Sequence, residues 1–106
     1  MAWFGGKKDD VVVVAVRLDA TGQIDWLRAF ERRGPTWSDW IKIARAEAIE
    51  RIRSGEKFVT GERIIYQAGT FKTFDPVRIE ERDGGAYLVS GPENGQGDAL
   101  ARVPIL

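Results

Sequence analysis

The segment at residues 11–16 (VVVVAV) constrains the fold most, because it is an unbroken apolar row between two aspartates and Arg17. A strand with one face in water would alternate apolar and polar residues, so a continuous run of β-branched residues predicts a strand buried on both faces. We therefore expect an interior strand over Val11–Leu18. Some other part of the protein, or a second copy of it, must then cover each face.

The next segments are a turn and an ambiguous apolar stretch. Asp19 and Gly22 in "DATGQ" predict a turn, since an aspartate can accept hydrogen bonds from the backbone ahead of it and glycine tolerates a positive φ. In residues 24–33 (IDWLRAFERR), apolar residues recur at helical spacing, which favours a short helix. A strand paired back onto Val11–Leu18 is the alternative.

Residues 36–54 predict the main helix. Thr36 and Asp39 have the spacing of a capping box, Glu47 and Arg51 form an i,i+4 pair, and the Ser54-Gly55 pair ends the helix. One face of this helix carries an apolar stripe made of Trp37, Ile41, Ala44, Ala48 and Ile52.

The second half of the chain predicts β structure. Residues 58–66 read as a strand with a bulge or bend at Gly61. Asp83-Gly84 predicts a two-residue hairpin turn, which places Ile79 opposite Leu88 and Glu80 opposite Tyr87. Pro76 marks the start of the first hairpin strand and argues against a place at the centre of the sheet.

These elements predict an α+β fold. We expect a single, mostly antiparallel sheet of about four strands, with one main helix and an additional short helix packed on it, in the order β-(α)-α-β-β-β. Residues 1–10 are expected to be a flexible N-terminal segment and residues 11–90 a single α+β domain. Residues 91–106 are expected to be a flexible C-terminal tail, because "GPENGQGDAL" is polar and rich in glycine.

Composition narrows the chemistry. The chain has 16 basic and 16 acidic residues, so no overall field attracts nucleic acid or an anionic membrane. It contains no cysteine and no histidine, which excludes disulfides, thiol nucleophiles and the common zinc ligands. We expect no cofactor, no metal and no membrane association. The apolar run at residues 11–16 lacks the pattern of a signal peptide, so a cytoplasmic location is predicted.

The sequence favours a non-enzymatic module for protein-protein interaction or assembly, a homodimer above all. The buried first strand and the apolar chain ends favour this function, since such ends suit strand addition to a neighbour. The residues predicted to make the contacts are Trp3, Phe4, Trp40, Ile43, Val103, Ile105 and Leu106.

Two alternatives remain open. One is a small nucleic-acid-binding module, which would use an aromatic such as Trp37 or Tyr66 with a basic set made of Arg28, Arg32, Arg33, Lys42, Arg45, Arg51, Arg53 and Lys57. Interleaved carboxylates favour a solvated helix over this alternative. The other is a small enzyme with a carboxylate-based site built from Glu62, Glu80 and Tyr87.

Overall fold

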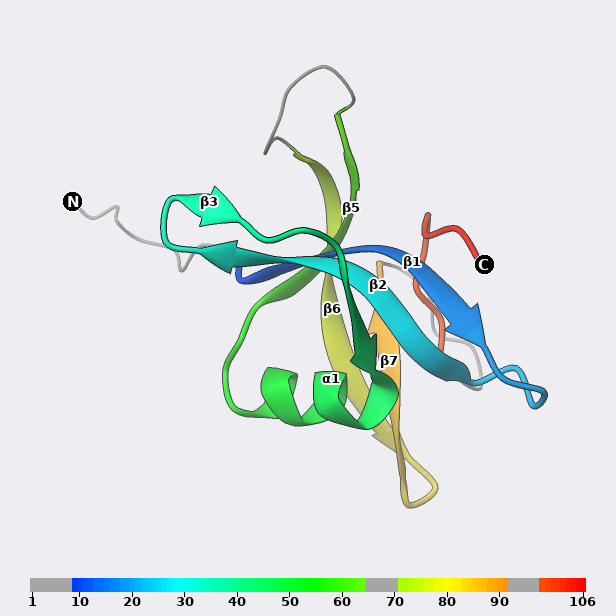
Figure 1. Ribbon diagram of the computed structural model, residues 1–106. Helices are drawn as coiled ribbons and strands as arrows, with labels where there is room; N and C mark the ends of the chain where they lie inside the picture. The colour runs from blue at the N-terminus through cyan, green and yellow to red at the C-terminus, as the bar shows by residue number, and fades with distance from the viewer. Residues whose placement is uncertain (1–8, 65–70, 92–97) are drawn as a thin grey trace.

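The structure is a computed structural model that describes residues 9–64, 71–91 and 98–106. In these ranges the chain forms one helix and a seven-stranded sheet (Figure 1). The elements are β1 (Val11–Leu18), β2 (Ile24–Arg33), β3 (Thr36–Trp37), β4 (Ile41–Ala44), α1 (Arg45–Arg53), β5 (Phe58–Arg63), β6 (Phe71–Arg82) and β7 (Gly85–Ser90).

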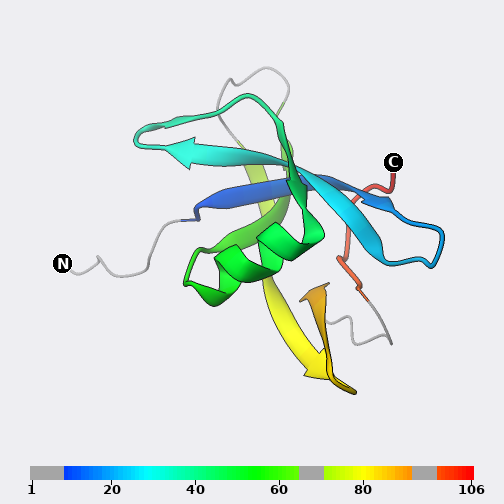
Figure 2. The ribbon, with the colours of Figure 1, turned by 60° about the horizontal axis from the view of Figure 1, so that its bottom comes forward.

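The predicted α+β fold with about four strands is wrong. The described part is 58% strand and 10% helix, and its strands form one curled sheet in the order β3-β2-β1-β5-β6-β7, with β4 also paired to β2. The sheet is mixed, because β1 and β5 are parallel. Helix α1 lies against β2, β4 and β6 on one side of this sheet (Figure 2).

Strand β1 is an interior strand, as the valine run predicts. It pairs with β2 along its whole length, and with β5 through Val11, Val12 and Val13. Val11, Val13 and Val16 belong to the core cluster that also includes Ala48 and Ile49 of α1. Side chains alternate along a strand, so Val12 faces the other side, where its partner on β2 is Phe30. Val12 is only 1% exposed, so this second face of β1 is covered as well.

Residues 24–33 form strand β2, so the favoured helix is wrong and the alternative strand is confirmed. A register shift near Leu18 explains the misleading spacing. Leu18 and Arg17 pair with Ile24 and Trp26, which leaves Asp25 as an extra residue in β2. Ile24 and Leu27 can then both face the core although they are three positions apart.

The predicted helix over residues 36–54 is only half right. Its first half forms β3 and β4, which pair with β2, and the helix starts at Arg45. Thr36 does not cap the helix; its hydroxyl donates instead to the carbonyl oxygen of Arg33. The pairing of Ile41 and Ile43 with β2 overrides the helical spacing, and the end of the helix at Ser54-Gly55 is confirmed.

Several local predictions are confirmed. The hairpin turns at Asp83-Gly84 with Ile79 opposite Leu88 and Glu80 opposite Tyr87. Strand β5 shifts register between Val59 and Gly61. Only glycine fits at position 61, because a Cβ there would lie 2.7 Å from the carbonyl oxygen of Lys72 and 2.9 Å from Cγ1 of Val12.

The C-terminal segment from residue 98 bridges two strands. Ala99 pairs with Val89 of β7, and Ile105 pairs with Val16 of β1. Its buried anchor is Asp98, whose carboxylate accepts hydrogen bonds from the backbone N–H groups of Ile24 and Leu88, each at 2.9 Å. The predicted flexible segments also include residues 1–8 and 92–97, which lie outside the described ranges.

Within those ranges, no helix has the length and apolar character that a membrane crossing requires.

Candidate functional site

The candidate site lies on the outward face of β2 and of the strands beside it. Leu27 and Ala29 point into the core, and each is 0% exposed. Because side chains alternate along a strand, the neighbouring residues point the other way. This outward set alternates between aromatic and basic residues: Trp26, Arg28, Phe30 and Arg32.

Each residue of this outward set takes part in a cation–π contact: the aromatic residues contact a basic side chain, and the basic residues contact an aromatic ring. Lys42 lies 4.5 Å from the ring centre of Trp26, and Arg28 lies 4.4 Å from that of Trp40. Arg32 lies 4.4 Å from the ring centre of Trp37, and Arg63 lies 5.8 Å from that of Phe30. We call this surface the aromatic–basic face; its residues are Trp26, Arg28, Phe30, Arg32, Trp37, Trp40, Lys42 and Arg63.

The cations of the aromatic–basic face have no carboxylate partner in residues 9–64, 71–91 and 98–106. Among the described residues, Arg28, Arg32, Lys42 and Arg63 form no ion pair. The Nε group of Arg28 is buried and has no hydrogen-bond partner in the described part of the chain. An unpaired buried donor is costly, so this N–H contributes no stabilising hydrogen bond within the described part of the chain.

The arginines of α1 are different, because carboxylates surround them. Arg45 donates to both carboxylate oxygens of Asp98, at 2.8 and 3.0 Å, and these hydrogen bonds raise the pKa of Arg45. Arg51 contacts Glu56 at 2.7 Å and Glu31 at 2.9 Å, and the hydrogen bonds that it donates to Glu56 above all raise the pKa of Arg51. These guanidinium groups hold the fold together and are not available to a ligand.

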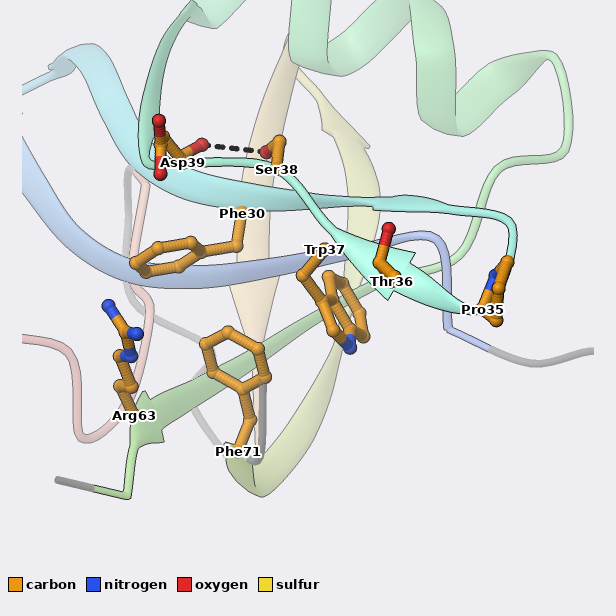
Figure 3. A pocket seen from close by; sticks show the side chains of 8 residues that line it. All are labelled: Phe30, Pro35, Thr36, Trp37, Ser38, Asp39, Arg63 and Phe71. Atoms are coloured by element: carbon orange, nitrogen blue, oxygen red, sulfur yellow. Dashed lines mark hydrogen bonds between the residues drawn. The ribbon is translucent and has the colours of Figure 1, made fainter. Parts of the chain in front are cut away.

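A cleft of about 420 Å³ opens at one end of the aromatic–basic face (Figure 3). Three rings from three strands line it: Phe30 of β2, Trp37 of β3 and Phe71 of β6. The ring centre of Phe71 lies 5.0 Å from those of both Phe30 and Trp37. The remaining lining residues are Pro35, Thr36, Ser38, Asp39 and Arg63.

Ser38 and Asp39 form the polar wall of the cleft at the break between β3 and β4. The hydroxyl of Ser38 accepts from the backbone N–H of Glu31 at 3.0 Å and donates to the carbonyl oxygen of Asp39 at 2.6 Å. These bonds hold the break against β2. The exposed carboxylate of Asp39 has no hydrogen bond or ion pair to any described residue, so it can accept hydrogen bonds from a ligand.

The structure separates the residues predicted to make protein contacts. Trp40, Ile105 and Leu106 are exposed, at 50%, 66% and 43%. Ile43 is 1% exposed and lies in the core, and Val103 packs against the core. Trp3 and Phe4 lie outside the described residues.

The two alternative residue sets are also divided. Arg28, Arg32 and Lys42 lie on the aromatic–basic face, whereas Arg45, Arg51 and Arg53 are paired with carboxylates elsewhere. The carboxylate set is only partly brought together: Glu80 lies opposite Tyr87 in the β6–β7 hairpin, whereas Glu62 lies opposite Lys72 near the other end of β6. Tyr66 lies outside the described residues, and no described group of three or more carboxylates could hold a metal ion.

Sequence reasoning missed four residues that line the cleft: Phe30, Asp39, Arg63 and Phe71. One signal was present, because aromatic and basic residues alternate at Trp26, Arg28, Phe30 and Arg32 with the period of a strand. The assignment of residues 24–33 to a helix concealed it. Arg63 and Phe71 come from distant strands, and only the curl of the sheet brings them to Phe30.

The comparisons with known proteins identify no relative. No family model matches the chain, and no curated protein or solved structure is significantly similar to it. The function must therefore be argued from the site itself.

Proposed function

We propose that the protein binds single-stranded nucleic acid on the aromatic–basic face. The observation that carries the proposal is the set of four stacks of cations on aromatic rings, whose cations have no carboxylate partner among the described residues. Proteins that bind single strands combine basic groups, which follow the phosphates, with aromatic rings on which bases stack. Both groups alternate here along one strand.

The geometry favours a single strand over a duplex. Rings interleaved with cations can stack only with bases that are not already stacked in a helix. A guanidinium that lies on an aromatic ring keeps its N–H groups at the edge, where they can donate to phosphate oxygens. The sheet holds these groups in fixed positions, so little side-chain entropy is lost on binding.

Fluorescence anisotropy of a labelled single-stranded oligonucleotide, titrated at several salt concentrations, tests the proposal. We expect binding that weakens steeply with salt, with a slope of about 0.7 per phosphate contacted. The double variant Arg28→Ala/Lys42→Ala should bind at least about tenfold more weakly and show a shallower slope.

The matched control is Arg53→Ala/Arg78→Ala, which removes two cations that are paired with Glu81 and Glu80 outside the aromatic–basic face. It changes the net charge equally and should retain most of the affinity. A wild-type protein that does not bind, or two double variants that lose equal affinity, would contradict the proposal.

A second candidate function is self-association, which the exposed edge of the sheet supports. Among the described strands β4 pairs only with β2, so its outer edge is open, and Trp40 beside it is 50% exposed. An open edge is a template for strand addition. Light scattering should then give a dimer mass that Trp40→Glu reduces, whereas a monomer mass at high concentration would exclude it. Under both candidate functions the protein acts by binding and not by catalysis. The cytoplasmic location stays a prediction.

A further inference from the structure

The cleft at the end of the aromatic–basic face differs from the rest of that surface, because it combines three rings with a carboxylate that has no partner among the described residues. We propose that this cleft binds one base of the strand and that Asp39 selects guanine. The inference rests on the proposed function and adds a base preference to it.

The rings make the cleft suitable for a flat aromatic ligand. Trp37, Phe30 and Phe71 come from three different strands, so the sheet fixes their relative positions (Figure 3). Trp37 is only partly buried, whereas Phe30 is buried, with 8% of its surface exposed. A volume of about 420 Å³ lies within the usual range for small-ligand pockets. A single base entering from the open side can therefore stack on Trp37.

The charges around the cleft suit a base that remains attached to its phosphates. Arg32 stacks on Trp37 and Arg63 stacks on Phe30, so a cation lies at each of two rings that line the cleft. Asp39 supplies one negative charge among them. The two cations outweigh it, so a phosphate on either side of the bound base is attracted, although a carboxylate lies next to the base.

Asp39 distinguishes the bases through the donors that they offer. An ionised carboxylate only accepts hydrogen bonds, and its two oxygens can accept from two adjacent donors. Guanine presents two adjacent N–H donors, N1 and N2, on its Watson–Crick edge. Adenine and cytosine place an acceptor beside their amino group, and uracil has a single N–H between two carbonyl groups. The carboxylate therefore matches guanine and meets an unfavourable acceptor in adenine and cytosine.

The test compares nonamers of uridine that carry one central guanine, adenine, cytosine or inosine, with anisotropy of a terminal fluorophore as the readout. We expect the guanine oligonucleotide to bind about tenfold more tightly than those with adenine or cytosine. Inosine lacks the N2 amino group, so its affinity should fall between those of guanine and adenine.

Two variants assign the preference to Asp39. Asp39→Asn should reduce the preference for guanine to less than about threefold, while affinity for the all-uridine nonamer is unchanged or rises because a negative charge is removed. Asp25→Asn removes an exposed carboxylate of the same hairpin that does not line the cleft, and should keep the preference.

Three outcomes would overturn the inference. Equal affinities for the guanine and adenine oligonucleotides would remove the base preference and leave the proposed function intact. A preference that persists in Asp39→Asn, or an inosine oligonucleotide that binds as tightly as guanine, would exclude recognition by Asp39. If none of the oligonucleotides binds, the proposed function fails together with the inference.

Discussion

The two sides of the β2 hairpin use the same residue type in opposite ways. On the helix side, Arg45 is 19% exposed and Arg51 is 20% exposed, and carboxylates hold both. On the aromatic–basic face, Arg28 and Lys42 lie against tryptophan rings without any ion pair to a described residue. The chain has equal numbers of acidic and basic residues, yet no carboxylate of the described residues pairs with the four cations of the aromatic–basic face.

The difference shows how a chain without net charge can keep a basic surface. A largely buried guanidinium needs a counter-charge, because an unpaired charge in the interior is costly. A cation on an exposed ring gains about 0.5–1 kcal/mol from the ring and stays hydrated on its other side. Ion-paired arginines therefore mark what stabilises the fold, and stacked cations mark what is available to a ligand.

The largest expected effect comes from Asp98→Ala, which removes the ion pair with Arg45 on the helix side of the sheet. The substitution leaves the guanidinium of Arg45 without its partner and the N–H groups of Ile24 and Leu88 without their acceptor. We expect the free energy of unfolding to fall by about 3–5 kcal/mol, enough to unfold much of the protein. Urea denaturation followed by circular dichroism measures it.

Asp25→Ala is the control for Asp98→Ala. Asp25 is exposed and lies in the same hairpin as Ile24, and its loss should change the unfolding free energy by less than about 0.5 kcal/mol. Equal midpoints for the two variants would mean that Asp98 does not anchor the C-terminal segment.

A paired comparison of Arg51→Ala with Arg28→Ala should separate the two sides directly. Arg51→Ala removes charged hydrogen bonds to Glu56 and the contact with Glu31, so we expect a loss of about 2 kcal/mol. Arg28→Ala removes one stack and a buried donor that has no partner, and should cost less than about 1 kcal/mol. Thermal unfolding of both variants shows which one loses more stability. A larger loss for Arg28→Ala than for Arg51→Ala would contradict the view that ion-paired arginines stabilise the fold and stacked ones do not.

The sequence predicted those parts of the fold that local chemistry determines. Asp83 and Gly84 both adopt positive φ, as the turn requires, and that turn fixes every pair of the β6–β7 hairpin. The valine run predicted β1 as an interior strand, because a strand or helix with one face in water would interrupt such a run with polar residues. Gly61 marked the bulge in β5 for a steric reason that operates over a few ångströms.

Long-range pairing decided the parts that sequence reasoning missed. Ile41 and Ile43 fit a helical stripe and a strand equally well, and the partners offered by β2 decide between them. The extra residue Asp25 gave β2 a helix-like spacing. This ambiguity affected the prediction of the candidate site most. The rings and cations of the site share a face only if residues 24–33 form a strand and if β5 and β6 curl back toward that strand.

Trp40→Ala should have a smaller effect on stability than either arginine variant, although it removes the most exposed ring of the aromatic–basic face. Half of the side chain is already in water, so its loss forfeits little burial. We expect a change of about 0.5 kcal/mol in thermal unfolding, together with weaker binding of single strands because base stacking on one ring contributes about 1–3 kcal/mol. A large loss of stability would indicate that Trp40 is part of the fold and not of a binding surface.

The smallest effect is expected at Asp19. Its hydrogen-bond donors among the described residues are all neutral, whereas Asp98 also accepts from the charged Arg45. The Thr21 hydroxyl donates to it at 2.6 Å, and the N–H groups of Thr21 and Gln23 donate at 2.8 and 3.1 Å. The Thr21 hydroxyl above all lowers the pKa of Asp19 below its ordinary value of 3.8. Because the folded pKa is lowered, the ionised carboxylate stabilises the turn above pH 3.8, and this contribution is lost as the pH falls through the folded value.

Asp19→Asn retains an acceptor oxygen but carries no charge, so its Tm should lie slightly below that of the wild type at pH 5–7. The gap should close as the pH falls from 5 to well below 3.8, because the wild-type carboxyl then becomes protonated. Thermal unfolding of both proteins across that range measures the gap. A gap that stays constant would mean that the charge of Asp19 contributes nothing, and a gap that widens in acid would reverse the expected sign. The exposed position of Asp19 explains why the effect is small: solvent screens its charge, whereas the burial of Asp98 makes the pairing of that carboxylate essential.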